Sequence, residues 1–439
     1  MAEPAIARSV RPIHPVPDVV PLTRFDLHDI ESVRLLLRGS SIVDWVSLHF
    51  AVDEDIDAFL RVNGFEPSEP KDQMRLLVLK RRAAVYLEEH LKYRVPEAIR
   101  EAPDVQWLFR AASNREGRRA HRFYACITLK VMHIIHHSDA HELLSMIQVS
   151  QAELAVLQHA KIERAVRGFL ERSFPIEEFS GNLKTPYSIF SKLLAKKDTQ
   201  SALIFDKLRF RFVMERLEDI PPLLLALSRE LLPFNYVVPG QSHNSLVDLY
   251  RMLVRAGNVN VLREKDAVLN MNEQLTADVT GDRRNEFSGP DYRVVNFVSD
   301  VPLRVDRVLS LSENQTRELG PIVFGSVEFQ IVDIQTAQAN EVGENRHVLY
   351  KARQRVMVRQ RLERGRRAAS VDGKGLSKRT QNQIAAFEKH EKHEKHDKHD
   401  KHDKHDKHDK REKHEAAEKH GSGSTHAASP SRPPGRSDR

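Results

Sequence analysis

Apolar residues recur at helical spacing through the first part of the chain. Within 72–93 they follow one another at intervals of three or four positions, at Leu76, Leu79, Ala83, Leu87 and Leu91. Because an α-helix completes a turn in about 3.6 residues, this spacing places them on one face that can pack into a core. Similar patterns run through three later segments, 122–137, 140–147 and 152–170. We therefore predict a helical domain over 25–175, preceded by a flexible arm over 1–24.

From about residue 176 the pattern changes to strands that alternate with short helices. Segments rich in β-branched and aromatic residues predict strands at 202–214, 292–306 and 322–335. Helices are expected to begin after Thr185 and after Asp219, where prolines occupy first-turn positions that need no amide hydrogen. The polar stretch 264–291 resembles an inserted loop. The alternation predicts an α+β fold, in which a mixed sheet flanked by helices spans 176–350.

The strand within 205–214 has one apolar and one basic face. Alternation puts a first set of side chains on the core side: Leu208, Phe210, Phe212 and Met214. The opposite side carries Lys207, Arg209 and Arg211. Three neighbouring cations repel one another, so a polyanion such as a triphosphate is a natural partner, and a solvated surface is the alternative.

A second strand, 327–332, repeats this arrangement. Val327, Phe329 and Ile331 alternate with the polar residues Glu328 and Gln330. If the two strands lie close together in one sheet, Asp206 and Glu328 can converge beside the cations and hold a magnesium ion between phosphate oxygens. Lys184 stands immediately before a predicted helix N-terminus, where free amides favour anions.

The C-terminal part is strongly charged and lacks a core pattern. A predicted basic helix and linker cover 351–387, and within 351–367 eight basic residues accompany the single acid Glu363. This segment can bind RNA or a ribosome, or its arginines can pair with acids of the folded part. The predicted disordered tail, 388–439, includes a tract with nine histidines, which can bind transition metals weakly, although a solvating role is the favoured interpretation.

Composition limits the class of protein. The 439 residues have a formal charge of +7 and are 40 % hydrophobic, enough for a large core. The single cysteine, Cys126, excludes an intramolecular disulfide framework, and its apolar surroundings predict a packed thiol. The proline-rich start lacks the apolar region of a secretory signal, and no uncharged apolar run of membrane-spanning length occurs. We expect a cytoplasmic protein that does not associate with membranes.

Four histidines cluster in the segment 133–141. If the helix is continuous, His133, His137 and His141 follow at successive intervals of four residues, with His136 beside them. This spacing can bind zinc. Because no second motif accompanies it, we favour a structural or surface role for these histidines.

The order of motifs resembles the nucleotidyltransferase domain of RelA/SpoT-type alarmone synthetases. That family has a basic motif of the form R-x-K-x-x-x-S-I-x-x-K, matched here by Lys184, Ser188-Ile189 and Lys192, with Asn182 in place of the arginine. A strand with D-x-x-x-x-R follows in the family, and Asp206 and Arg211 match it at the same spacing.

Two further motifs complete the resemblance, which covers about 165 residues. In the family's G-Y-x-S-hydrophobic-H loop, this chain keeps Ser245 and the aliphatic position, and His243 replaces the tyrosine. The family's V-E-x-Q-hydrophobic-R-T strand is matched over 327–331, but Val332-Asp333 stand where arginine and threonine are expected.

The resemblance implies a magnesium-dependent enzyme that transfers a pyrophosphoryl group from ATP to the 3′-hydroxyl of a guanine nucleotide. It implies that Asp206 and Glu328 are catalytic and ligate Mg²⁺, with Glu328 orienting or deprotonating the attacking hydroxyl. Nucleotide contacts would come from Lys184, Ser188, Lys192, Arg209, Arg211, His243 and Gln330. Because the G-Y-x-S-hydrophobic-H loop is poorly matched, a second hypothesis stays open. In it, the chain is a noncatalytic regulator that binds a nucleotide or RNA on the same sheet.

Deletion of residues 388–439 is expected to leave the melting temperature within about 1 °C of the full chain, because a tract with no apolar core stabilises nothing by burial. Thermal unfolding of the two chains, followed by circular dichroism, measures the difference. A loss of several degrees would mean that the tail docks on the folded part.

Overall fold

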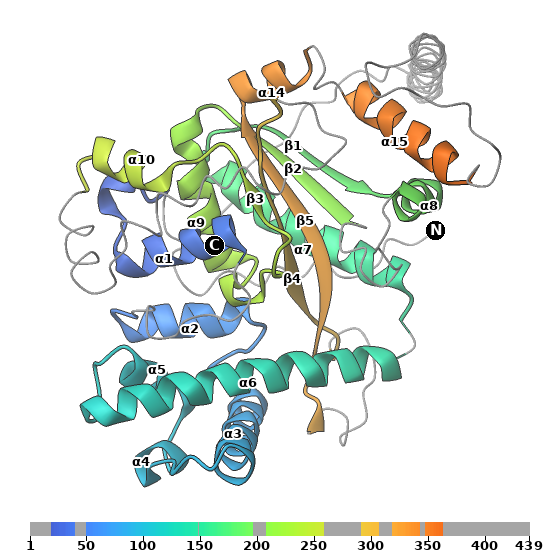
Figure 1. Ribbon diagram of the computed structural model, residues 1–439. Helices are drawn as coiled ribbons and strands as arrows, with labels where there is room; N and C mark the ends of the chain where they lie inside the picture. Colours follow the sequence, from blue (N-terminus) through green and yellow to red (C-terminus); the bar gives the residue numbers. More distant parts are fainter. Residues whose placement is uncertain are drawn as a thin grey trace, which may run out of the picture. The chain divides into compact units, whose positions relative to one another are not determined.

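The helical spacing of the first part of the chain produces helices in the structure (Figure 1). The computed structural model describes residues 19–39, 50–147, 149–195, 208–258, 291–306, 318–342 and 347–362. Its first helices are α1 (Leu27–Arg38), α2 (Asp53–Val62), α3 (Pro70–Val85), α4 (Glu97–Arg100), α5 (Val105–Ala112), α6 (Arg119–Met146) and α7 (Gln151–Glu171), with the short helical turns η1 (Leu22–Arg24) and η2 (Tyr86–His90).

The helix predicted over 72–93 ends earlier than its apolar spacing suggests. Four residues of the predicted stripe are buried, at Leu76, Leu79, Ala83 and Leu87. After α3 the hydrogen bonding changes to the π-helical turn η2, in which the amide of Leu91 donates to the Tyr86 carbonyl five residues back. Because a π-helical turn contains more residues than an α-helical turn, the side chains that follow it project in a different direction. Leu91 consequently leaves the stripe and is 50 % exposed.

Local capping chemistry sets the ends of α1. The Asp26 carboxylate accepts a hydrogen bond from the Asp29 amide, and the Asp29 carboxylate accepts one from the Asp26 amide. This reciprocal pair satisfies amides that the helix leaves without partners. The helix ends at Gly39, which has φ +67° and lies so close to Ser242 that an added Cβ would be 2.4 Å from its Oγ. Glycine therefore fits this position for both backbone and steric reasons.

The second part of the described chain forms a five-stranded mixed sheet. Its strands are β1 (Ile176–Leu183), β2 (Leu208–Met214), β3 (His243–Asn244), β4 (Val295–Arg304) and β5 (Ile322–Asp333), arranged in the order β1-β2-β5-β4-β3. β2 and β5 pair in parallel, and the other pairings are antiparallel. The α+β class predicted from the sequence is confirmed.

Apolar alternation gives the sheet its inner face. Phe210 and Phe212 of β2 lie beside Phe329 and Ile331 of β5, and all four are fully buried. The Phe210 and Phe329 rings stack with centroids 6.2 Å apart. Burial of each such side chain contributes about 1.5–3 kcal/mol, so this layer holds β2 to β5.

One hydrophobic core joins the helices to the sheet. It includes Phe50 and Leu108 from the helical part together with Phe212 and Phe329 from the sheet. The chain divides into two compact units, Met1–Arg361 and Leu362–Arg439. The change of pattern near residue 176 is thus a change of secondary structure inside the first unit, and separate folding of 25–175 stays a prediction. The Cys126 thiol is buried in the same core, as predicted.

Two side chains of α7 bind backbone carbonyls of β5 and β4. The Gln158 amide donates to the Gly325 carbonyl at 2.6 Å, and the Lys161 ammonium donates to the Pro302 carbonyl at 2.7 Å. Burial lowers the pKa of Lys161 to about 8. An ammonium without a carboxylate partner in this position is costly, and loss of its proton relieves that cost.

The remaining described helices flank the sheet (Figure 1). They are α8 (Pro186–Ala195), α9 (Ile220–Glu230), α10 (Leu249–Arg255), α14 (Ile334–Asn340) and α15 (His347–Leu362), with the turns η4 (Leu217–Asp219) and η5 (Phe234–Tyr236). α8 begins at the predicted proline, where the Ser188 amide donates to Thr185 Oγ1 at 3.3 Å. The predicted basic helix corresponds to α15, and Arg361 donates to the Leu194 carbonyl at 3.0 Å.

Several sequence predictions fall outside the described residues. They concern most of the arm 1–24, the loop 264–291 except its last residue, the linker beyond Leu362 and the tail 388–439. Among the helices that the structure describes, none combines the length and the apolar character needed to cross a membrane.

Lys161→Met is expected to remove a pH dependence of stability. Between about pH 8 and the ordinary lysine pKa of 10.5, the unfolded chain keeps a proton that folded Lys161 has lost, so this group adds stability as pH rises through that window. Urea unfolding at pH 7.5 and 9.5 should show wild type gaining about 1–2 kcal/mol relative to the variant. Lys71→Met, at an exposed lysine of α3, is the control; equal gains in wild type and Lys161→Met would contradict the prediction.

Candidate functional site

Two rows of polar side chains cross the face of the sheet opposite the phenylalanines. Residues paired in register project from the same face of a sheet. The first row runs through Asn182, Arg209 and Glu328 to the apolar Val298, and the second through Ser180, Arg211, Gln330, Asn296 and His243. We call these residues the polar rows. The two strands do lie side by side in one sheet, since Arg209 is the register partner of Glu328 and Arg211 that of Gln330.

Glu328 lies between cations and is more enclosed than an open sheet face predicts. Only 8 % of the residue is exposed. Its Oε2 is 3.8 Å from the Lys184 ammonium, and its Oε1 accepts a hydrogen bond from Gln330 at 3.2 Å. Lys184 follows β1 directly, so the end of that strand brings the lysine to a carboxylate two strands away. The site thus combines residues from two of the predicted motifs.

Arg209 and Arg211 supply two further positive charges on the same face. Both are partly exposed. Within the part of the chain that the structure describes, neither forms an ion pair with an acid. Two guanidinium groups held at alternate positions of one strand can bind the oxygens of a phosphate chain in a forked geometry.

Tyr292 belongs to the site although its sequence position did not indicate it. The residue precedes β4 and packs on a small apolar cluster of Val213, Val294 and Val332 that borders the polar rows. Burial raises the pKa of the Tyr292 phenol, and the charges of Arg211 and Arg209 oppose that rise. Tyr292 therefore packs against the valine cluster and lies within electrostatic range of the two arginines. An aromatic residue at the start of the predicted strand 292–306 was the available signal.

The other predicted nucleotide contacts take different positions. His243 lies in β3 at the far end of the second row, opposite Asn296. Ser188 is in the first turn of α8 and shares a hydrogen bond with Thr185 Oγ1 at 3.1 Å, and Lys192 is one turn further along. The role of Ser188 and Lys192 in nucleotide binding stays a prediction.

Of the two predicted magnesium ligands, only Glu328 lies within the described residues. Asp206 lies outside them. Magnesium favours oxygen ligands and is commonly held by one or two carboxylates together with substrate phosphates. The buried Glu328 carboxylate, next to the arginine of the neighbouring strand, fits this requirement.

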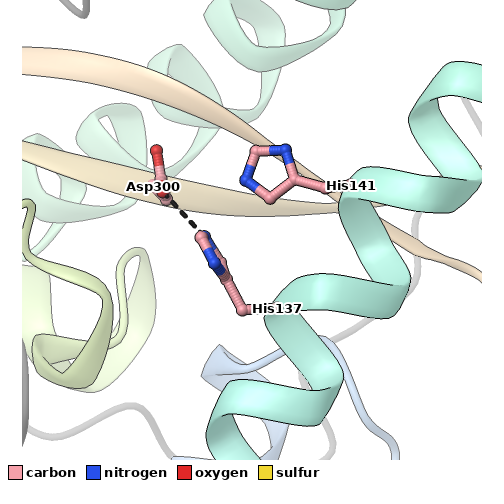
Figure 2. A group of neighbouring side chains, drawn as sticks. All are labelled: His137, His141 and Asp300. Carbon is pink, nitrogen blue, oxygen red and sulfur yellow. Dashed lines mark hydrogen bonds and ion pairs between the residues drawn. The ribbon is translucent and has the colours of Figure 1, made fainter.

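A second polar group lies further along the same sheet face, where α6 contacts β5. His137 and His141 of α6 point toward Asp300 of β4 (Figure 2). The predicted helical continuity is correct, but the four histidines separate into two kinds. Burial lowers the pKa of His133 to about 3 and that of His136 well below its ordinary value, so these two are neutral packing residues.

Comparisons with known proteins give a distant likeness of fold. No family model matches the chain, and no curated protein matches it. A solved structure of small alarmone synthetase 1 from Bacillus subtilis is 15 % identical with a TM-score of 0.24, and the match covers 48 % of this chain and 88 % of the other. A second structure of that synthetase, bound to its product pppGpp, is 13 % identical with a TM-score of 0.22, covering 53 % of this chain and 92 % of the other.

Inorganic tripolyphosphate is expected to raise the melting temperature of the full chain, and Arg211→Gln should weaken this effect. Loss of one forked, charge-assisted contact corresponds to about tenfold weaker binding. The rise in Tm, followed over a tripolyphosphate titration, gives the apparent affinity. Arg251→Gln, at a side chain that is 76 % exposed on α10, should bind like wild type. If Arg211→Gln and Arg251→Gln respond alike, the polar rows are not the anion site.

Proposed function

We propose that the chain is a nucleotide pyrophosphokinase that transfers the β,γ-phosphates of ATP to the 3′-hydroxyl of a guanine nucleotide. One observation carries the proposal: Lys184, the alternate residues 209 and 211, and the alternate residues 328 and 330 come from motifs far apart in the sequence and meet on one sheet face. The resemblance of these motifs to alarmone synthetases requires such a convergence.

The charge pattern suits a triphosphate donor. Lys184, Arg209 and Arg211 stand around the single carboxylate of Glu328 in the described part of the polar rows, which leaves a net positive face. Phosphoryl transfer depends mainly on positioning and on stabilisation of charge that spreads over the transferred group. The cations provide that stabilisation, with Arg209 and Arg211 contacting the phosphate oxygens.

Glu328 takes the role of the base. Its carboxylate is held by Gln330 on one oxygen and faces Lys184 with the other. A carboxylate fixed in this way can accept the proton of an acceptor hydroxyl within hydrogen-bonding distance. When the donor phosphates draw Lys184 toward themselves, the oxygen now facing the ammonium becomes available to that hydroxyl.

Magnesium would be held by Glu328 and Asp206 together with the donor phosphates, and when bound it would neutralise part of the phosphate charge. Tyr292 would supply an aromatic surface for the acceptor base, because its ring lies against the valine cluster beside the arginines. This assignment compensates for the histidine at position 243, where the related motif has a tyrosine.

A noncatalytic nucleotide-binding regulator is the second candidate. The observation that favours it is the engagement of Glu328 by Lys184 at 3.8 Å, together with Asn182 where the related motif has arginine. In that case the sheet binds a nucleotide without transferring phosphates. RNA binding through 351–367 would be compatible with either candidate.

Purified full chain, incubated with Mg²⁺, ATP labelled in its β,γ-phosphates and GDP or GTP, should form a product that carries the label. Glu328→Gln should lower the rate by about 10²–10⁴-fold, because the amide cannot accept the proton. Chromatographic separation of the nucleotides measures the transfer. The matched control is Glu89→Gln, which changes an exposed acid of η2 that is distant from Glu328 in the sequence.

Two outcomes separate the candidates. Transfer by wild type that Glu328→Gln abolishes, with the tripolyphosphate response kept, supports the enzyme. Absence of transfer to any nucleotide acceptor, with that same response intact in wild type, supports the regulator and rejects the proposed activity.

A further inference from the structure

Helix α6 and strand β4 bring three metal-ligating side chains together. His137 and His141 are one helical turn apart, so they project from the same face of α6. Asp300 comes from β4, more than 150 residues later in the sequence. One ligand atom from each residue lies within 4.8 Å of the others (Figure 2). Among the described residues, no other set of three or more acids, histidines and cysteines has its ligand atoms this close together.

Neighbouring side chains already orient two of the three. His137 Nε2 is 3.0 Å from Asp300 Oδ2, and the other carboxylate oxygen accepts a hydrogen bond from the Ser326 hydroxyl at 2.5 Å. The His137 ring stacks on Tyr236, with centroids 5.4 Å apart, and also contacts Phe324. Residues that hold ligands in position strengthen metal sites, because less freedom is lost when the ion binds.

The other polar residues of this helix segment have different partners. His133 Nδ1 is 3.1 Å from the Asn235 amide, and His136 is enclosed by Phe65 and Phe324. Asp139 lies between the two candidate ligands in sequence but forms ion pairs at 2.5 Å with Arg75 and Arg82. On α6, the candidate ligands are therefore only His137 and His141, which project from one face of the helix.

The donor atoms favour a particular class of ion. Two imidazole nitrogens and one carboxylate oxygen suit zinc and similar transition metals, whereas magnesium and calcium prefer oxygen donors throughout. Three protein ligands leave a fourth position for water, as in open zinc sites. We propose that His137, His141 and Asp300 bind one zinc ion that joins helix α6 to strand β4.

Only a small movement is needed to close the site. Zinc bonds of 2.0–2.1 Å in a tetrahedral arrangement place ligand atoms about 3.3 Å apart. His141 is the exposed member, so its side chain can rotate toward the others without disturbing the core. The His137 and His141 rings are edge to face, with centroids 4.6 Å apart. A bound ion would link α6 to β4 in place of the direct contact between His137 and Asp300.

The site has a defined place relative to the polar rows. Asp300 and its register partner Ser326 are two residues from Val298 and Glu328, so all four share one face of the sheet. Zinc would fix the helical part to the same two strands that carry the polar rows. The proposal concerns binding and does not rest on the transfer activity.

Thermal unfolding of the full chain, stripped of metal with a chelator and titrated with zinc, tests the site. An ion that binds only the folded state raises Tm, and about a hundredfold excess over Kd should raise it by about 3–6 °C. The sequence predicts that the tail histidines lie outside the core, and zinc bound there equally in the folded and unfolded states leaves Tm unchanged. The readout therefore isolates the folded site.

His141→Gln and Asp300→Asn should each remove most of this rise. The first changes an exposed side chain, and the second preserves shape, so at least one variant is expected to fold normally. His90→Gln, at an exposed histidine of η2, is the matched control and should keep the full response. A wild-type Tm that does not respond to zinc, or a response that survives both substitutions, would overturn the proposal.

Discussion

The parallel pairing of β2 with β5 is the constraint on which the site depends. More than 100 residues separate the two strands in sequence, and burial of Phe210, Phe212, Phe329 and Ile331 on one face holds them in register. Since successive side chains of a strand alternate between faces, the same packing turns Arg209, Arg211, Glu328 and Gln330 to the other face. A slip of one residue would bury the arginines and expose the rings. The apolar layer therefore aligns the charges without touching them.

Departures from the alarmone-synthetase motifs have structural explanations at the end of β5. Val332, where the related motif has arginine, packs with Val213 and Val294 in the cluster that borders the polar rows. Asp333, at the threonine position, caps α14, and its carboxylate accepts a hydrogen bond from the Gln335 amide at 3.2 Å. Both residues thus stabilise the turn from strand to helix. Val332 is a member of the apolar cluster against which Tyr292 packs.

The helical part is bound to the sheet by polar contacts as well as by the shared core. Lys161 and Gln158 of α7 bind carbonyls near the end of β4 and in β5, and His137 of α6 contacts Asp300. Buried donors and acceptors are costly when they lack partners, so these contacts specify how the helices lie on the strands in a way that apolar packing alone does not. Any ligand that reorients β4 or β5 would therefore move residues of both the polar rows and the site of His137, His141 and Asp300.

The sequence by itself determined the local structure and the division of polarity within it. Periods of 3.6 and 2 are visible along the chain, so the helices, the strands β2, β4 and β5, and the two faces of β2 and β5 could be predicted, and so could the candidate residues Arg209, Arg211 and Glu328, whereas β1 was not predicted. Local pattern could not show that α3 gives way to a π-helical turn before Leu91, because a single wider turn leaves the apolar spacing unchanged. Only the tertiary structure decided which distant residues meet: Lys184 with Glu328, Tyr292 with the arginines, and Asp300 with His137 and His141. Those encounters depend on strand order and helix docking, which follow from the packing of the whole core and have no signature in any one segment.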